Sequence, residues 1–297
     1  MEDVSVALLA DQLHFVSGDK TGKIRYWRVE DGEEVGAPIN VGSAVRCIAT
    51  SRDRIVAGTA SHKLFVWDAK TRKEFCQFTH RNTHSVDISS DGTKVVIIGD
   101  RAVKVLSLPD GEKLWYNWYT GLTERCRTAN FSPDGLFIAL GLSFLSVFNS
   151  QDGKSIAEFQ VFQAVSVAWT SDSKQLFALT FGGNISCVDM YSQATLSTWP
   201  IHSRDRPTCI SLSTDGLFVV ASASTSVSFW DTRTNEQIGS IIRHPGSVRY
   251  LAVSQNYDLV MARSSNIALC DIRNVRFDVD DHVGGSSFDL RPVNLHS

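Results

Sequence analysis

One short pattern recurs along almost the whole 297-residue chain at a nearly constant interval. An alternating apolar stretch ends each time on an apolar residue that is usually followed by a polar one, and successive end points lie 39 to 42 residues apart. The end points are Trp27-Arg28, Trp67-Asp68, Leu106-Ser107, Phe148-Asn149, Val188-Asp189, Trp230-Asp231 and Cys270-Asp271. So regular a period indicates that one supersecondary unit is stacked repeatedly, because a single unit cannot bury its own apolar face.

The repeats contain strand patterns and no helical periodicity. In the fourth repeat, Thr-Ala-Asn-Phe-Ser-Pro-Asp-Gly (128–135) is followed by Leu-Phe-Ile-Ala-Leu-Gly and then by Leu-Ser-Val-Phe-Asn. Its Ser-x-Asp-Gly turn recurs at 89–92 and 213–216, and such turns are typical of hairpins between antiparallel strands. Seven units of this kind predict an all-β fold, a seven-bladed β-propeller of four-stranded antiparallel blades.

The charge balance bears on the class of partner. Lys and Arg number 29 against 32 Asp and Glu, so the net charge is -3, and a basic excess of the kind that binds nucleic acid is missing. No run of about eighteen apolar residues predicts a membrane span. The chain starts Met-Glu-Asp-Val, which is acidic where a signal peptide would be basic. We therefore expect a cytoplasmic or nuclear protein that binds neither nucleic acid nor membrane.

The repeat sequences resemble the WD-repeat family. The resemblance rests on Phe15-Val16-Ser17-Gly18 with Ile24-Arg25-Tyr26-Trp27, on the Ser-Pro-Asp-Gly turn, and on Val227-Ser228-Phe229-Trp230-Asp231. It covers residues 4 to 279, and Gly36-Ala37-Pro38-Ile39 and 171–183 are similar to the WD-repeat regions of fungal proteins. The domain prediction is a propeller over 1–279, followed by a tail over 280–297 that is either flexible or latches the ring seam.

The chain departs from the family pattern in two places. The family's buried network of His, Ser or Thr, Asp and Trp is incomplete in every repeat: the sixth has Trp230 without the Asp, and the third has Asp100 but ends on Leu106. The resemblance also implies that an N-terminal strand completes the last blade, yet this chain begins directly on a first strand. We therefore expect the outer strand of the last blade to come from its C-terminal side, with Val275–Val279 as the candidate.

Function is predicted from the aligned opening strands, in which five residues occupy one position. In the family this position opens toward the narrow face, at the mouth of the central channel. Three arginines there would focus a positive potential and favour an acidic or phosphorylated peptide. The alternative is that each Arg is an exposed strand-start residue paired with a local acid. The five residues are Arg46, His84, Arg127, Thr208 and Arg249.

An aromatic run at 115–119 is the second candidate surface feature. We expect Trp115 to pack between blades, and Trp118 and Tyr119 to lie in the loop before the fourth repeat, beside the arginines. Exposed aromatics next to Arg are residue types that dominate binding energy at interfaces. The alternative is that this loop folds its rings onto the blade edge.

Together these features predict a non-enzymatic scaffold for protein partners, acting as a monomer or within a larger complex. A first alternative is a substrate receptor of a cullin-type ubiquitin ligase, because Asp-x-Arg at Asp231–Arg233 and Asp271–Arg273 resembles the adaptor contacts of such receptors. A propeller-based enzyme is a second alternative, although no HExxH or GxSxG motif occurs. No catalytic residue, cofactor or metal site is predicted.

Overall fold

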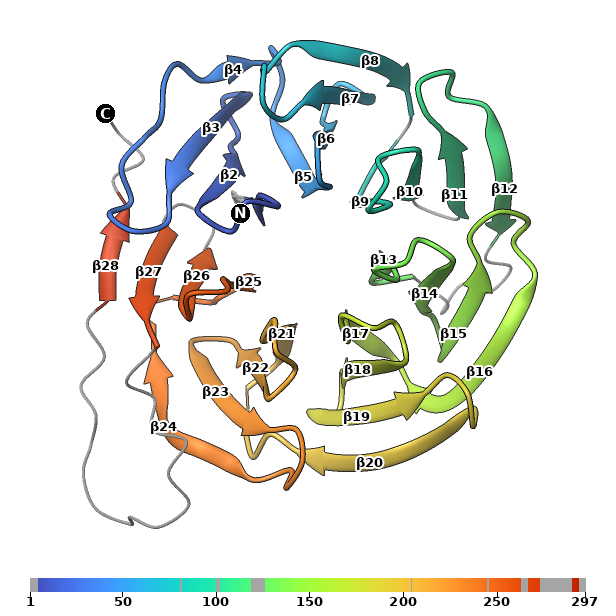
Figure 1. Cartoon of the computed structure of the whole chain (residues 1–297), viewed down its shortest axis with the longest axis vertical. Coiled ribbons are helices and arrows are strands. Elements are labelled where there is room, and N and C mark those ends of the chain that lie inside the picture. Colours follow the sequence, from blue (N-terminus) through green and yellow to red (C-terminus); the bar gives the residue numbers. More distant parts are fainter. Residues whose placement is uncertain are drawn as a thin grey trace.

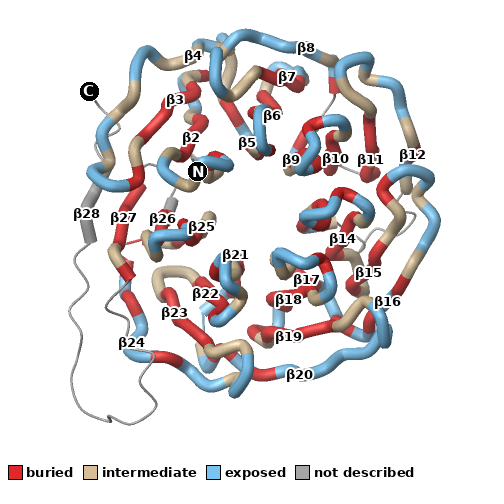
Figure 2. Tube along the Cα trace, viewed as in Figure 1, coloured by how far each residue is buried: buried red, intermediate tan, exposed pale blue. Residues whose placement is uncertain are grey.

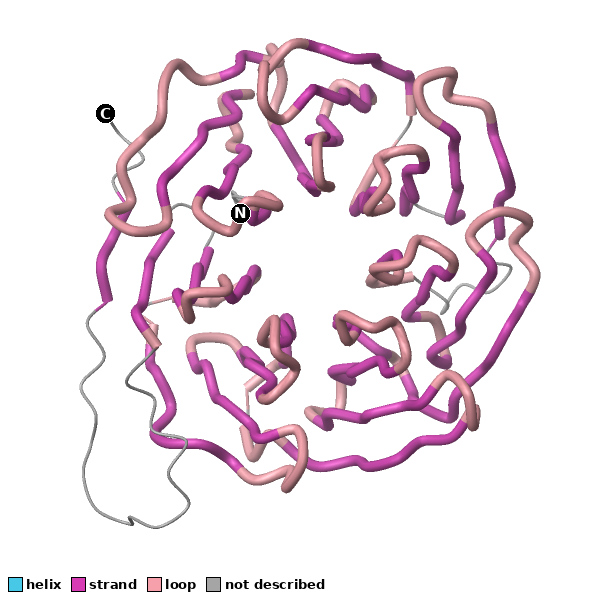
Figure 3. Tube along the Cα trace, viewed as in Figure 1, coloured by secondary structure: helices cyan, strands magenta, loops and turns pink. Residues whose placement is uncertain are grey.

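The structure is a computed structural model of the whole chain. It describes residues 5–80, 82–99, 102–118, 126–203, 205–244, 246–262, 267–272 and 290–293. These residues form seven four-stranded antiparallel sheets arranged as blades around a central channel, and no helix occurs among them (Figures 1 and 3). The predicted all-β, seven-bladed propeller is therefore confirmed.

Each blade uses its strands in chain order from the channel outward (Figure 1). The first, innermost strands are β1 (Ser5–Leu8), β5 (Val45–Thr50), β9 (Ser85–Ile88), β13 (Ala129–Phe131), β17 (Ala164–Trp169), β21 (Pro207–Leu212) and β25 (Tyr250–Val253). The second strands are β2 (His14–Gly18), β6 (Arg54–Thr59), β10 (Lys94–Ile98), β14 (Phe137–Gly141), β18 (Gln175–Thr180), β22 (Phe218–Ala223) and β26 (Asp258–Ala262).

The outer half of each blade is built in the same way. The third strands are β3 (Lys23–Arg28), β7 (Lys63–Asp68), β11 (Ala102–Ser107), β15 (Phe144–Asn149), β19 (Asn184–Asp189), β23 (Ser226–Asp231) and β27 (Ile267–Asp271). The fourth strands are β4 (Ile39–Asn40), β8 (Glu74–Thr79), β12 (Lys113–Trp118), β16 (Ser155–Phe162), β20 (Ala194–Pro200), β24 (Gln237–Arg243) and β28 (Leu290–Val293).

The apolar core lies between adjacent blades. Second and third strands are buried almost throughout, whereas the fourth strands β4, β8, β12, β16, β20 and β24 are largely exposed where their burial is described (Figure 2). Seven apolar clusters each join two neighbouring blades. Trp27 and Trp230, two of the repeat end points, are fully buried in such clusters. Packing between like units therefore stabilises the ring, as in other repeat proteins.

The Ser-x-Asp-Gly motifs form the turns between first and second strands. In the fourth blade the Ser132 hydroxyl donates to Asp134 Oδ1 at 2.5 Å, and the same carboxylate oxygen accepts the Leu136 N–H at 3.0 Å. Gly135 has a φ of 72°, which only glycine adopts without strain. The motif therefore specifies the turn locally, and its repetition places equivalent turns on one face of the ring.

The seam joins the first and seventh blades without strand exchange. All four strands of the seventh blade come from the C-terminal part of the chain, and β28 pairs with β27 as the outer strand. β28 lies within the segment 280–297, whereas the candidate outer strand at 275–279 lies outside the described residues. Phe15 and Trp27 of the first blade pack against Val260, Ile267 and Leu269 of the seventh.

Among the described residues, the buried polar network that the resemblance implies is present only in part. Trp27 Nε1 donates to Ser17 Oγ at 2.8 Å in the first blade, and Trp230 Nε1 donates to Ser228 Oγ at 2.8 Å in the sixth. His80 is buried with its Nδ1 3.0 Å from Thr83 Oγ1, and burial lowers its pKa to about 4, so that the ring is neutral at physiological pH. Asp100, the Asp of the third repeat, lies outside the described residues.

Candidate functional site: the channel mouth

Strand register places the five predicted mouth residues at one equivalent position in their blades. In each of these blades, the residue two positions after the predicted mouth residue lies in the first strand. That residue pairs with the fourth residue of the second strand. The pairs that define this register are Ile48↔Ala57, Val86↔Ile97, Ala129↔Leu140, Ile210↔Ala221 and Leu251↔Met261. The alignment made from sequence therefore agrees with the backbone hydrogen bonding.

The channel is a cavity of roughly 900 Å³ bounded by the first strands. His84, Arg127, Thr208 and Arg249 line it. Arg46 does not line it, although its neighbour Cys47 does, and the Arg46 side chain is exposed instead. The structure thus brings four of the five predicted residues together at the channel and leaves Arg46 beside it.

Two arginines at or beside the mouth, Arg46 and Arg127, have no neutralising acid nearby in the described part of the chain. Arg46 and Arg127 are exposed, and neither has a described carboxylate within 4 Å. Among the described residues, the alternative interpretation, in which each strand-start Arg pairs with a local acid, therefore finds no support for these two residues. Their charges are open to a ligand.

Phe181 and Arg206 are site residues that the sequence reasoning missed. Phe181 follows β18 and is exposed, and Arg206 precedes β21, and both line the same cavity as Arg127. The guanidinium carbons of Arg127 and Arg206 lie 5.3 and 5.1 Å from the centre of the Phe181 ring. Arg206 occupies a non-equivalent loop position, so alignment of the repeats gives no signal for it.

Among the described residues, the two faces of the ring differ in net charge. Strands alternate in direction within an antiparallel blade, so the starts of the first and third strands lie on the same face as the ends of the second and fourth. We call this face the channel-mouth face. Its described strand ends and loops carry only two carboxylates, Asp19 and Asp205. The bases at the same ends and loops are Lys20, Lys23, Arg46, Lys63, Arg127, Arg206, Arg243 and Arg249. The small net charge of the chain therefore conceals a basic face.

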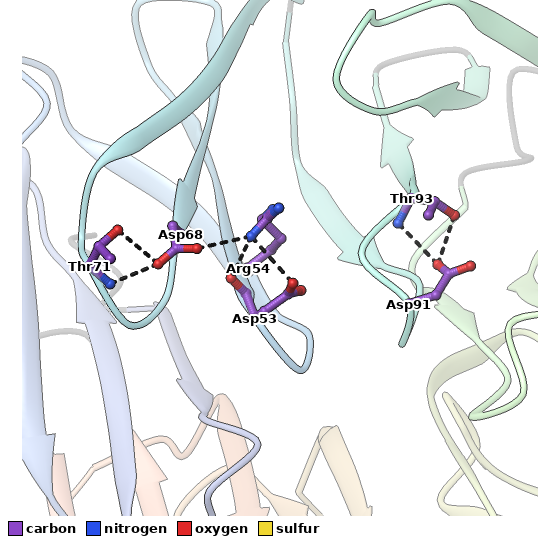
Figure 4. Close-up of polar contacts among 6 residues, drawn as sticks. All are labelled: Asp53, Arg54, Asp68, Thr71, Asp91 and Thr93. Atoms are coloured by element: carbon purple, nitrogen blue, oxygen red, sulfur yellow. Dashed lines mark hydrogen bonds and ion pairs between the residues drawn. The ribbon is translucent and has the colours of Figure 1, made fainter.

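Acidic side chains gather on the opposite face, where the turns between first and second strands lie. Six of these turns contain an aspartate: Asp11, Asp53, Asp91, Asp134, Asp172 and Asp215. Carboxylates on this face accept hydrogen bonds within their own turns, as Asp68 does from Thr71 and Asp91 does from Thr93 (Figure 4). Asp68 accepts hydrogen bonds from the Thr71 N–H at 2.7 Å and from its hydroxyl at 2.8 Å, and Arg54 Nη1 lies 3.1 Å from its other oxygen. The hydrogen bond from the Thr71 N–H, more than any other contact, lowers the pKa of Asp68.

Asp87 places one carboxyl in the channel wall. Its Oδ2 accepts the Phe131 N–H of the next blade at 2.8 Å. Burial raises the pKa of Asp87 to about 7, although hydrogen bonds from Phe131, Ile88 and Asn130 act in the opposite direction. Near neutral pH this carboxyl is therefore partly protonated, which leaves the basic side chains to dominate the potential of the mouth.

The aromatic run is only partly placed. Trp115 is buried among residues of the third and fourth blades, and its Nε1 donates to the Ser150 carbonyl at 2.9 Å, as expected for packing between blades. Trp118 is the last residue of β12 and pairs with Ala102, so it belongs to the fourth strand and not to the following loop. Tyr119 lies outside the described residues.

The Asp-x-Arg arginines are on the acidic face where they are described. Arg233 is exposed in the turn between β23 and β24, where its N–H donates to Asp231 Oδ1 at 2.8 Å. Arg273 lies outside the described residues. The ligase-adaptor contact stays a prediction.

In the part of the chain that the structure describes, no three His, Cys, Asp or Glu side chains come close enough to hold a metal ion. Nor do these residues form a helix with the length and apolarity needed to cross a membrane.

Comparison with known proteins supports the repeat assignment. Residues 193–231, from β20 to the end of β23, match the family model described as WD domain, G-beta repeat. No curated protein matches the chain. This repeat match, within a ring of seven four-stranded blades, identifies the chain as a WD-repeat β-propeller.

Proposed function

We propose that this propeller is a non-enzymatic interaction scaffold whose channel-mouth face binds an acidic segment of a protein partner. WD-repeat propellers generally serve as protein-interaction scaffolds and are typically not enzymes. The observation that carries the proposal is the uncompensated charge of Arg46, Arg127 and Arg206 at and beside a channel also lined by Arg249.

Electrostatics supports an anionic ligand at this face. A concave site with low-dielectric walls strengthens the field of the charges that line it and raises the rate at which an oppositely charged partner arrives. The opposite face is acidic and repels the same partner. The partner would therefore approach with one orientation, with its acidic segment over the channel.

The aromatic run extends the proposed surface toward the third blade. Trp118 ends β12 at the channel-mouth face, and Tyr119 continues from it in the chain. Aromatic residues beside arginines supply apolar contact area that a purely charged surface lacks. We include both residues in the proposed binding surface, with His84 on the channel wall.

Charge reversal tests the proposal. Arg46, Arg127 and Arg249 are replaced together by Glu, and binding of a fluorescein-labelled dodecapeptide of glutamate is followed by fluorescence anisotropy. Because each exposed charge contact contributes about 0.5–1 kcal/mol, we expect affinity to fall roughly ten-fold to a hundred-fold. The melting temperature should stay close to wild type, because all three side chains are exposed.

The matched control reverses three exposed lysines on the opposite face, Lys70, Lys154 and Lys174, and changes the net charge equally. We expect this control to bind the glutamate peptide as wild type does. Equal losses in the two triple variants would show that net charge alone governs binding and would overturn the proposal. Absence of binding to the wild-type protein at low salt would also overturn it.

A further inference from the structure

We propose that a second pocket, where the fifth blade connects to the sixth, binds a free aliphatic α-amino acid. This pocket has a volume of roughly 290 Å³. The described residues that line it do not overlap with those that line the central channel. The proposal therefore concerns a site separate from the channel mouth, and it goes beyond the scaffold function.

Two walls enclose the pocket. One wall is the connection between β20 and β21, which contributes Ile201, His202 and Asp205. The other wall is the outer half of the sixth blade, where Ser226 pairs with Arg243 across β23 and β24 (Figure 1). Paired residues present their side chains on one face of a sheet, and here that face also carries the apolar residues that pack against the fifth blade.

The pocket exists because the sixth blade is locally smaller than other blades. Its turn between the second and third strands has two residues, 224–225, whereas the same turn has three residues in the second and fifth blades. β23 then begins with Ser226 at the position that Lys63 holds in β7. Two residues later, Ser228 stands where the second blade has Phe65. A short turn and two small side chains therefore leave space between the blades.

A shifted histidine also shapes the connection. After the second and sixth blades, His80 and His244 are buried, and their N–H groups donate to the turn between the second and third strands of the same blade at 2.7 and 2.8 Å. After the fifth blade, Ile201 is buried and makes the equivalent bond at 2.9 Å. His202 is therefore exposed one position later, with a left-handed φ of 49°. Its ring lies at the pocket, 6.1 Å from the ring of Trp230.

The two walls carry charges of opposite sign. Arg243 lies on the blade wall and Asp205 on the connection, and both residues are exposed. Among the described residues neither has an ion-pair partner within 4 Å, so the two do not neutralise each other. A guanidinium group donates two parallel hydrogen bonds to a carboxylate, and a carboxylate accepts hydrogen bonds from an ammonium group. A ligand that carries both a carboxylate and an ammonium group would therefore pair with both walls.

The remaining lining sets the size and polarity of the ligand. Ile201 and Ala223 are buried, and Ile241 is a large apolar side chain left exposed at the pocket. An aliphatic group would remove this apolar surface from water, which is favourable. Pockets for drug-sized ligands have volumes of about 300–1,000 Å³, so this one suits a smaller molecule. An aliphatic α-amino acid such as leucine combines the two charges, the apolar side chain and the small size.

The test is an NMR titration of the full chain, isotopically labelled in its tryptophan side chains, with leucine as the probe. Trp230 Nε1 donates to Ser228 Oγ at 2.8 Å, and Ser228 lines the pocket, so the indole N–H resonance of Trp230 reports on occupancy. Trp230→Phe assigns that resonance. We expect a saturable shift with a dissociation constant of about 1 mM or lower.

Two analogues of leucine each lack one charge. Leucinamide has no carboxylate and N-acetylleucine has no ammonium group. Each should bind wild type at least about five-fold more weakly than leucine, because each loses one charge-assisted contact.

Two substitutions match the analogues. Arg243→Gln should weaken leucine binding at least about five-fold and leave leucinamide binding unchanged, because leucinamide has no carboxylate to pair with Arg243. Asp205→Asn should weaken leucine binding to the same extent and leave N-acetylleucine binding unchanged. Arg233→Gln, at an exposed arginine on the opposite face, is the matched control and should leave all three affinities unchanged.

The outcomes separate this inference from the proposed function. The triple Glu variant of Arg46, Arg127 and Arg249 should bind leucine as wild type does, whatever its affinity for the glutamate peptide. Equal affinity for leucine and N-acetylleucine would overturn the free amino acid in favour of the C-terminal residue of a peptide. Absence of a saturable shift, or leucine affinity that is unchanged in both Arg243→Gln and Asp205→Asn, would overturn the amino-acid site altogether.

Discussion

The carboxyl group of Asp87 in the channel wall should make the stability of the ring fall as pH rises through the neutral range. Burial raises the pKa of this group to about 7 in the folded protein, from 3.8 for an ordinary Asp. Between these two values the folded protein holds a proton that the unfolded chain has released. The free energy of unfolding therefore decreases with increasing pH in that window.

The size of the effect follows from the pKa difference. Each pKa unit corresponds to about 1.4 kcal/mol, so a rise of about three units gives a ceiling of about 4 kcal/mol. Asp87 is only half-buried and borders the channel, so water reduces the loss and we expect about 2 kcal/mol between pH 4 and pH 8. Asp87→Asn removes the titrating carboxyl group, and the amide oxygen of the new Asn side chain can still accept the Phe131 N–H.

The assay is urea unfolding of wild type and Asp87→Asn at pH 5, 6, 7 and 8, with the difference between them taken at each pH. We expect the free energy of unfolding of Asp87→Asn to increase relative to that of wild type as pH rises, so that the variant is more stable than wild type at pH 8. Asp91→Asn is the control of opposite sign: burial raises the pKa of Asp91, but hydrogen bonds from Ser89 and Thr93 outweigh it and lower that pKa. This second variant should lose stability at neutral pH and approach wild type in acid. A difference for Asp87→Asn that stays constant from pH 5 to pH 8 would refute the reasoning.

Two further predictions concern packing between and within blades. Trp27→Phe leaves the buried Ser17 hydroxyl without its partner and should lower the free energy of unfolding by about 1–3 kcal/mol beyond the lost packing. Adding Ser17→Ala should restore part of that loss, because the unpaired hydroxyl is then removed. If urea titrations show no recovery in the double variant, this explanation is contradicted. Gly141→Ala would place a methyl group 2.4 Å from the Ala164 carbonyl oxygen of the next blade and should lower the free energy of unfolding by about 1–3 kcal/mol. Gly182→Ala, where the nearest neighbour is 3.9 Å away, should change it by no more than about 0.5 kcal/mol. Equal melting temperatures of the two variants would show that the blades adjust to the added methyl group.

Much of the candidate site could be predicted because it repeats. Arg46, His84, Arg127, Thr208 and Arg249 align in sequence because first strands share one register, and four of them do line the channel. Arg46 is the exception because its exposed side chain stands beside the cavity and not on its wall. A shared register thus fixes the backbone position but leaves the direction of a long side chain open.

Other parts of the site were beyond a sequence argument. Phe181 and Arg206 belong to loops of different blades, and no repeat position links them. Trp118 was expected in a loop, but pairing with Ala102 extends β12 to include it. Contacts of this kind depend on which loops the closed ring brings together, and local patterns carry no information about that.

The periodic strand pattern by itself determined the architecture, because a forty-residue unit with one apolar stripe per strand has only its copies to pack against. Turn chemistry and strand register followed from the same local residues, such as the Ser-x-Asp-Gly motifs. Only the tertiary structure decided where the charges lie. A net charge of -3 describes the sum, but alternating strand direction sends the basic loops to one face and the acidic turns to the other. Closure of the ring then placed Arg127 and Arg206 on a single phenyl ring, because it brings together loops that lie far apart in the chain.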